Sequence, residues 1–401
     1  MIGVKVDIKE YEKKGKLKKQ KGFSEEETLL THYDTVSKRA QKIAANYFKE
    51  NIYDLNGFKE MELQEAIQEY LFEIKASVPF PGPSWDEKKF TFIDLFAGIG
   101  GFRLALQSLK GKCVFSSEWD EAARETYRAN YGEIPFGDIT KASVKSSIPK
   151  DFDILCGGFP CQPFSRAGVS ARNFLGLEHG FDHPTQGNLF FEIIEIAKKH
   201  RPKVLFLENV KNLRSHDGGN TFKIIEEMIT GLGYSFFYKI INAQTEIPQR
   251  RERTYMVCFK NPKIKFEFPE FKGEPKQLGS IITNEVSDKY TISDNLWLGH
   301  QKRSKRNKDR GTGFTTRVAD LSKPSNTIVA RYYKDGKECL IPQANKNPRM
   351  LTEEECVKLF GFPNGFKFHQ SRNSAYKQFG NSVAVPVIKK IGIEIIKHLN
   401  K

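Results

Sequence analysis

The sequence lacks three features that would each have placed it in another class of protein. It has no run of about 18 apolar residues, which excludes a membrane-spanning helix. Its six cysteines form no CxxC pair, which argues against both a zinc site and a disulfide framework and fits a reducing compartment. Its first residues lack the apolar stretch of a signal peptide. These absences predict a cytoplasmic protein without a bound metal.

Acidic charge is also scarce. The 401 residues include 64 Lys and Arg but only 49 Asp and Glu, which gives a formal net charge of +15. A surplus of this size predicts a polyanionic partner, most simply nucleic acid. The competing explanation is a basic, lysine-rich proteome with no such partner.

A complete dinucleotide-binding fingerprint is missing as well. A short apolar run at residues 92–96, a glycine-rich turn at 97–101 and a helical stretch at 102–109 form the first unit of a doubly wound sheet. Arg103 stands where the third glycine of G-x-G-x-x-G would be. The pyrophosphate cradle of NAD is therefore not expected. An adenosine ligand without phosphates, S-adenosylmethionine above all, fits better.

Two acidic residues follow in register with this unit. Glu118 ends the next strand, expected at 113–117, about 20 residues after the glycine turn, where a carboxylate binds ribose hydroxyls. Asp138 closes residues 134–137 and could accept a hydrogen bond from the exocyclic amine of a base. The alternative for each is a solvated strand end.

Strands and helices keep alternating up to residue 260, which predicts an α/β fold with a doubly wound, mostly parallel sheet. We expect an N-terminal basic and helical segment with a linker at 1–88, a main domain at 89–260, a smaller domain at 261–348 and a C-terminal part at 349–401. Helical periodicity within the first segment predicts two helices, at about 29–47 and 61–74.

Cys161 lies between two prolines, directly after an apolar run that ends at Cys156. Proline restrains its own backbone and that of the residue before it, so the loop should be stiff and present the thiol. A small buried cysteine is the alternative. Reactive groups gather at the carboxyl ends of such strands. Glu208 follows the expected strand 204–207, and arginines crowd residues 249–253.

Five segments then carry a resemblance: residues 96–101, 158–162, 208–210, 249–253 and 378–383. In this order they closely resemble the bacterial DNA cytosine-C5 methyltransferases. The resemblance covers about residues 90–400, and residues 1–88 lie outside it. The resemblance implies the methyltransferase fold, the cofactor S-adenosylmethionine and duplex DNA as substrate. It also assigns 89–260 as the catalytic domain and 261–348 as the target-recognition domain, with 349–401 returning to the catalytic domain.

The resemblance also implies a role for each catalytic candidate. Cys161 would be the thiolate that adds to cytosine C6, and Glu208 the acid at ring nitrogen N3. Arg253 would hold the pyrimidine O2, and Arg251 would support it or the thiolate. The cytosine would flip out of the duplex. Ser165 and Arg166, which begin a long loop, would lie near it.

The cofactor residues implied by the resemblance come from five stretches of the chain. They are Phe96, Gly98, Ile99, Gly100, Glu118, Trp119, Asp138, Ile139, Pro160, Asn381 and Val383. Glu118 would bind the ribose, and Trp119 would stack on adenine; the alternative for Trp119 is a core residue.

DNA contacts are expected at residues 300–310, 312–316 and 331–336. A basic run, residues 300–310, includes Arg303 and Arg306, and we expect it to hold phosphates. The stretch with Arg331 and Tyr332 resembles the recognition region of enzymes that act on CC(A/T)GG or CCNGG. We expect a monomer whose system includes a cognate restriction endonuclease.

Other functions are alternatives to DNA cytosine-C5 methylation. A methyltransferase for exocyclic amines would need an Asp/Asn-Pro-Pro-aromatic loop, which the chain lacks around Cys161. A similar fold methylates tRNA cytosine, but the basic region points to DNA. Residues 1–88 could be a DNA clamp or a transcriptional regulator; the alternative is a structural brace.

Overall fold

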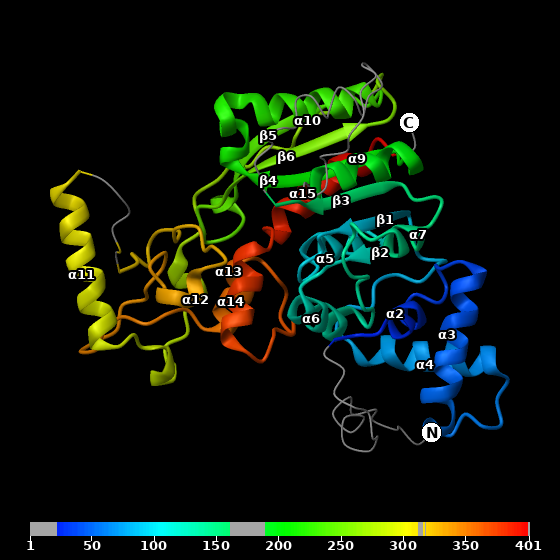
Figure 1. The fold of residues 1–401 in the computed structure, drawn as a ribbon. Coiled ribbons are helices and arrows are strands. Elements are labelled where there is room, and N and C mark those ends of the chain that lie inside the picture. Colours follow the sequence, from blue (N-terminus) through cyan, green and yellow to red (C-terminus); the bar gives the residue numbers. More distant parts are fainter. Residues whose placement is uncertain (1–21, 161–188, 312–315, 317, 400–401) are drawn as a thin grey trace.

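The computed structural model describes residues 22–160, 189–311, 316 and 318–399, and a six-stranded sheet forms its centre (Figure 1). The strands lie in the order β2-β1-β3-β4-β6-β5. Their bounds are β1 Phe90–Leu95, β2 Gly111–Ser117, β3 Ile154–Gly158, β4 Val204–Val210, β5 Phe237–Asn242 and β6 Glu252–Phe259. β2, β1, β3 and β4 are parallel to one another, and β6 is antiparallel to both β4 and β5. The predicted α/β fold with a mostly parallel sheet is confirmed.

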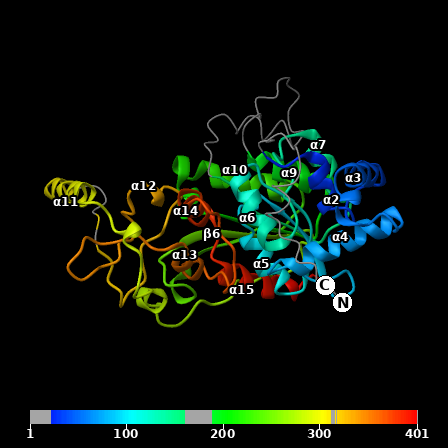
Figure 2. The ribbon, with the colours of Figure 1, turned by 90° about the horizontal axis from the view of Figure 1, so that it is seen from below.

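Helices cover both faces of the sheet, because its central strands are apolar on both sides. Side chains alternate along a strand, so Phe92 and Ile93 of β1 enter separate cores. One core is closed by α5 (Gly101–Gln107) and α15 (Val385–Ile396), the other by α9 (Leu189–His200) and α10 (Asn220–Gly231). Figure 2 shows these two pairs on opposite sides of the sheet. The connections between the strands also contain the helices α6 Glu121–Tyr131 and α7 Ala142–Ser146 and the 3-10 helices η2 Lys211–Arg214, η3 His216–Gly219 and η4 Ala243–Thr245.

The N-terminal segment contains more helices than its periodicity predicts. They are α2 Glu25–Thr31, α3 Lys38–Asn51, the 3-10 helix η1 Tyr53–Asn56 and α4 Leu63–Ser77. The first expected helix is divided because the chain turns after His32, where the amide of Thr35 donates to the His32 carbonyl. Ser37 then starts α3 by accepting from the amide of Ala40, as a serine at an N-cap does.

The region between β6 and the last helices has little regular structure. It holds the 3-10 helices η5 Leu278–Ile281 and η6 Asp288–Tyr290, the long helix α11 Asp294–Asp309 and the short helix α12 Tyr332–Asp335. α11 stands well away from the sheet (Figure 1). His300 of α11 is fully buried, and its imidazole bonds the carbonyl of Asp335. This bond fixes the helix to the segment around α12.

The chain then returns to the sheet through α13 Glu353–Leu359, α14 Arg372–Asn381 and α15. α15 packs on α5, where the glycine at 392 brings the helices close: a Cβ added there would meet Leu109 at 3.0 Å. In the part of the chain that the structure describes, no helix has both the length and the apolar character to cross a membrane.

A buried ion pair secures the start of α13. Both guanidinium nitrogens of Arg349 donate to the Glu355 carboxylate, at 2.7 and 2.8 Å. The same carboxylate accepts from the amides of Thr352 and Thr283, both at 2.8 Å. Glu355 is fully buried, so water cannot replace any of these partners.

We therefore expect Glu355→Gln to lower the free energy of unfolding by about 3–5 kcal/mol, because it leaves the Arg349 charge buried and unpaired. Urea unfolding followed by circular dichroism measures the change. The exposed neighbour Glu354→Gln is the control and should change stability by about 0.5 kcal/mol or less. Equal stability of the two variants would contradict the argument.

Candidate active site

The candidate site follows the carboxyl edge of the sheet. β1, β2 and β3 end there at Leu95, Ser117 and Gly158, and their loops carry the glycine turn, Glu118 and Pro160. Glu208 pairs with Gly158 across β3 and β4. β6 is antiparallel, so its beginning lies at this same edge, with Arg253 opposite Val210. The sheet order places the glycine turn and Glu118 over β1 and β2, and Glu208 and Arg253 over β4 and β6.

The glycine turn has the shape of a ligand cradle. Gly98 and Gly100 have positive φ of 54° and 80°, and Phe96, unusually for a residue with a side chain, has 55°. A Cβ added at Gly98 would meet nothing within 4 Å, whereas one at Gly100 would lie 2.4 Å from the ring of Tyr131. Gly98 therefore faces open space, and Gly100 is closed by protein. Ile99 is buried in the core.

Tyr131 is a supporting residue that the sequence did not reveal. Its ring lies against Gly100, and its hydroxyl donates to the Gly100 carbonyl at 2.8 Å. The residue is fully buried near the end of α6, about 30 positions from the turn that it supports. A tyrosine in an amphipathic helix gives no sequence signal for this role, because core packing produces the same pattern.

Glu118 is tied directly to the glycine turn. Its carboxylate accepts from the amide of Gly98 and from the amide of Asp120, each at 2.8 Å. Burial raises the pKa of Glu118, and these two amide donors oppose that rise. The neighbouring Trp119 is 79% exposed, which excludes the alternative that it is a core residue. Its indole is free to offer a flat apolar face at this edge.

Asp138 follows a segment that pairs with the end of β2. Phe136 donates its amide to the Ser116 carbonyl, and its own carbonyl accepts from the Glu118 amide, both at 2.8 Å. Asp138 itself accepts from the amide and the hydroxyl of Thr140 through one carboxylate oxygen. Ile139 is 3% exposed and packs into the core. Glu118 and the Asp138 loop are thus joined through the backbone of Phe136.

The C-terminal candidates reach the same edge. Val383 is buried, and a Cβ added at Gly101 would lie 2.7 Å from its side chain. Asn381, the last residue of α14, is exposed. The structure therefore brings the end of the chain to the glycine turn, as the resemblance implied.

Glu208 and Arg253 form the polar centre of the other half. The Nε atom of Arg253 lies 3.1 Å from Oε1 of Glu208, but this oxygen has no hydrogen bond of good geometry. A Cβ added at Gly158 would come within 3.2 Å of the other carboxylate oxygen, so glycine leaves that face open. Burial raises the pKa of Glu208, opposed by Arg253 and then Arg251. A raised pKa favours the protonated form that a general acid needs.

Asn209 is a second supporting residue without a predicted role. Its side-chain amide donates to the Phe159 carbonyl at 2.9 Å, and its oxygen accepts from the Val210 amide at 2.8 Å. Asn209 is 2% exposed, and its bond to the Phe159 carbonyl is buried. It thereby anchors the loop one residue before Pro160, the last described residue ahead of Cys161.

Arg251 bonds the backbone of two segments that are distant in the sequence. Its guanidinium is buried and donates to the carbonyls of Ile328, Gly380 and Ser382. Burial and then the nearby Arg253 lower the pKa of Arg251 to about 9. This arginine joins β6 to the segment around Ile328 and to the end of α14. Its predicted role, to support Arg253 or the thiolate, stays a prediction.

Cys161, Ser165 and Arg166 lie outside the described residues. The other cysteines are all described and buried: Cys113, Cys156, Cys258, Cys339 and Cys356. Burial raises the pKa of each of these thiols, to about 12 for Cys113 and Cys339. Buried thiols with raised pKa values are poor nucleophiles.

The predicted DNA contacts divide into two groups. Arg303 and Arg306 are exposed on α11, although Arg303 also pairs with Asp335 at 3.3 Å, and Arg331 is exposed too. Tyr332 is fully buried; its hydroxyl donates to the Cys339 carbonyl and accepts from the Leu351 amide. The expectation that Tyr332 contacts DNA is therefore wrong for this structure, because its ring and hydroxyl are used in the core.

Comparisons with known proteins agree with this geometry. The sequence model of the family described as C-5 cytosine-specific DNA methylase matches residues 90–397. The chain is 48% identical over 340 residues to the Type II methyltransferase M1.ScrFI of Lactococcus lactis subsp. cremoris, covering 82% of this chain and 85% of that protein. It is 35% identical over 426 residues to the DNA-cytosine methyltransferase of Escherichia coli K12, covering 91% and 90%.

A solved structure shares the fold at low sequence identity. The S. pombe Dnmt2 methyltransferase is 18% identical, with a TM-score of 0.59, and the match covers 78% of this chain and 99% of that one. The family match spans the glycine turn, Glu208, Arg253 and the returning C-terminal helices. The chain therefore belongs to the C-5 cytosine-specific DNA methylase family and is a C5-cytosine DNA methyltransferase.

Proposed function

We propose that the protein transfers a methyl group from S-adenosylmethionine to C5 of a flipped cytosine in a short duplex DNA sequence. The observation that carries this proposal is the ion pair of Glu208 and Arg253 beside Gly158, three residues before Cys161 and at the same edge as the glycine turn. An acid and a cation thus meet at the edge of the sheet where we propose that the adenosine ligand ends.

The residues on the β1 and β2 side fit S-adenosylmethionine. Gly98 faces open space, and the buried Glu118 carboxylate stands beside it, suited to ribose hydroxyls. Trp119 offers an exposed ring for adenine, and Asn381 and Val383 close the pocket from the far end of the chain. When bound, the cofactor supplies an electrophilic methyl group on a sulfonium.

The other residues activate the cytosine. The Cys161 thiolate forms a bond to C6, and Glu208 gives its proton to N3, so C5 becomes an enamine-like nucleophile. Arg253 pairs with Glu208, and we assign to it the pyrimidine O2. After C5 has taken the methyl group, the C5 proton leaves to a base, the bond to Cys161 breaks and N3 returns its proton to Glu208. Flipping exposes C6 at a cost of a few kcal/mol.

The biological setting follows from the relatives. Several are Type II methyltransferases, so we propose that the enzyme protects host DNA alongside a cognate restriction endonuclease. From the resemblance of the stretch with Arg331, we further propose that it acts on CC(A/T)GG or CCNGG, as a monomer. The packing of residues 22–78 against the catalytic domain favours a brace over a separate regulatory unit.

The catalytic roles predict the behaviour of two variants. Cys161→Ala should bind S-adenosylmethionine and incorporate no methyl group into DNA. Glu208→Gln should bind the cofactor and lose about 10²- to 10⁴-fold in rate, the usual contribution of a general acid. Tritiated-methyl transfer measures both, with the exposed Glu226→Gln on α10 as a control of unchanged rate. Turnover by Cys161→Ala, or bisulfite sequencing that shows methylation elsewhere than C5, would refute the mechanism.

The basic face of α11 predicts a second, separate effect. Arg306→Ala should weaken binding to duplexes of any sequence and reduce the slope of log affinity against log salt by about 1, because one phosphate contact is lost. Fluorescence anisotropy over a salt series measures this. Lys260→Ala is the matched control: this exposed lysine follows β6 at the edge of the sheet opposite Glu208. Equal slopes of log affinity against log salt for the two variants would contradict the proposal that α11 contacts DNA phosphates.

A further inference from the structure

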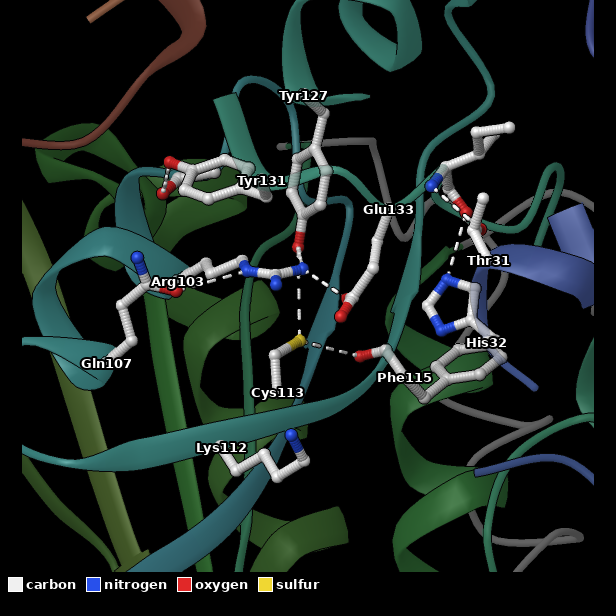
Figure 3. Close-up of polar contacts among 12 residues, drawn as sticks. Thr31, His32, Arg103, Gln107, Lys112, Cys113, Phe115, Tyr127, Tyr131 and Glu133 are labelled. Carbon is white, nitrogen blue, oxygen red and sulfur yellow. Dashed lines mark hydrogen bonds and ion pairs between the residues drawn. The ribbon is translucent and has the colours of Figure 1, made fainter. Parts of the chain in front are cut away.

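The N-terminal helices hold the segment that leads to Asp138. The family match begins at residue 90, so these helices lie outside it, yet they make buried polar contacts with residues 124–134. Figure 3 shows Thr31 and His32 of the N-terminal segment facing this part of the catalytic domain.

Both backbone groups of Ile134 are bonded by α2 and its cap. The Ile134 amide donates to the Thr31 hydroxyl at 3.1 Å, and its carbonyl lies 3.0 Å from Nε2 of His32. A carbonyl only accepts, so Nε2 carries the proton. Burial lowers the pKa of His32, which keeps the imidazole neutral with this nitrogen as its donor. The His32 ring also packs on Phe136, with centroids 4.8 Å apart.

The same segment is bonded on its other side by the catalytic domain. Phe136 exchanges two backbone hydrogen bonds with Ser116 and Glu118, at the end of β2. Arg124 of α6 donates to the Pro135 carbonyl at 2.9 Å. Residues 134–136 are thus held between β2 and α2, and they run directly into Asp138.

Two further contacts fix α2 against α6. Arg124 donates to the Thr28 hydroxyl at 3.2 Å, and Arg128 pairs with Glu27 at 3.1 Å. The guanidinium groups of both arginines also lie over the Phe23 ring, at 5.2 and 5.3 Å. Because α6 anchors α2 independently of Ile134, the positions of Thr31 and His32 are fixed, and both can hold Ile134 in place.

We infer that Thr31 and His32 are positioning residues for S-adenosylmethionine binding: they fix residues 134–136 and, through Phe136, the placement of Glu118 and Asp138. The inference rests on the proposed cofactor site. Without the Thr31 hydroxyl, the buried Ile134 amide has no partner, and the segment can move away from β2. Cofactor affinity should then fall while the chemistry on cytosine, on the far side of β1, is unaffected.

The test compares conservative variants of the full chain. Thr31→Val and His32→Phe keep shape and lose the hydrogen bond; each should raise the Kd for S-adenosylmethionine about three- to tenfold, the factor expected for one buried hydrogen bond. Thr31→Ser keeps the hydroxyl and should bind like the wild type. Thr35→Val is the matched control, because its hydroxyl bonds only the His32 carbonyl within the same turn.

Further readouts separate positioning from general stability. KM for the cofactor should rise with kcat and DNA affinity unchanged, and amide exchange at residues 134–138 should accelerate while β3 and β4 keep their protection. The inference is overturned if Thr31→Val binds the cofactor as tightly as Thr35→Val, or if exchange rises equally throughout the sheet. Glu118→Gln is measured in parallel: if it weakens cofactor binding while Thr31→Val does not, only the inference fails. If neither weakens it, the proposed cofactor site fails too.

Discussion

The buried ion pair between Arg103 and Glu133 is the interaction on which the proposed cofactor side of this enzyme depends. The two groups meet at 2.6 Å, and the guanidinium lies over the rings of Tyr127 and Tyr131 (Figure 3). Burial works to raise the pKa of Glu133, but the charge and the hydrogen bond of Arg103, together with other nearby basic groups, outweigh burial, and the pKa is lowered. The carboxylate is therefore charged, and loss of either partner would leave an uncompensated charge in the core.

This pair joins the parts of the site that come from separate stretches of the chain. Arg103 belongs to α5, the helix that starts from the glycine turn, and Glu133 begins the segment that leads to Asp138. Tyr131, which packs on Arg103, also supports Gly100. The residue that interrupts the dinucleotide fingerprint is thus the one that fixes the turn to the rest of the cofactor side.

A second junction organises the reactive side. Arg251 bonds the carbonyl of Ile328 and one at the end of α14, and Gln249 accepts from the Ile328 amide at 2.9 Å. At Gly380 the backbones touch, since a Cβ there would lie 2.2 Å from the carbonyl carbon of Val329. The segment of Ile328 and Val329 is therefore held against the same helix end that carries Asn381. Arg253, two residues along β6, remains free to pair with Glu208.

What the sequence by itself determined are the features that arise from local patterns. The apolar run, glycine turn and helix that begin at residue 92 predict the first β-α unit because each depends on neighbouring residues, and the fold confirms it. The expected strand end also places Glu118 correctly, directly after β2, whereas Glu208 lies within β4, which runs on to Val210.

Only the tertiary structure decided the roles that depend on distant partners. Arg251 bonds carbonyls 77 to 131 positions away, and Thr31 bonds an amide 103 positions away. Tyr332 was expected at the DNA but is buried, because its hydroxyl fits between Cys339 and Leu351. A guanidinium or a phenol has the same chemistry in a core and at a surface. Which of the two it occupies is set by packing between segments that are far apart in the chain, and no local pattern records that.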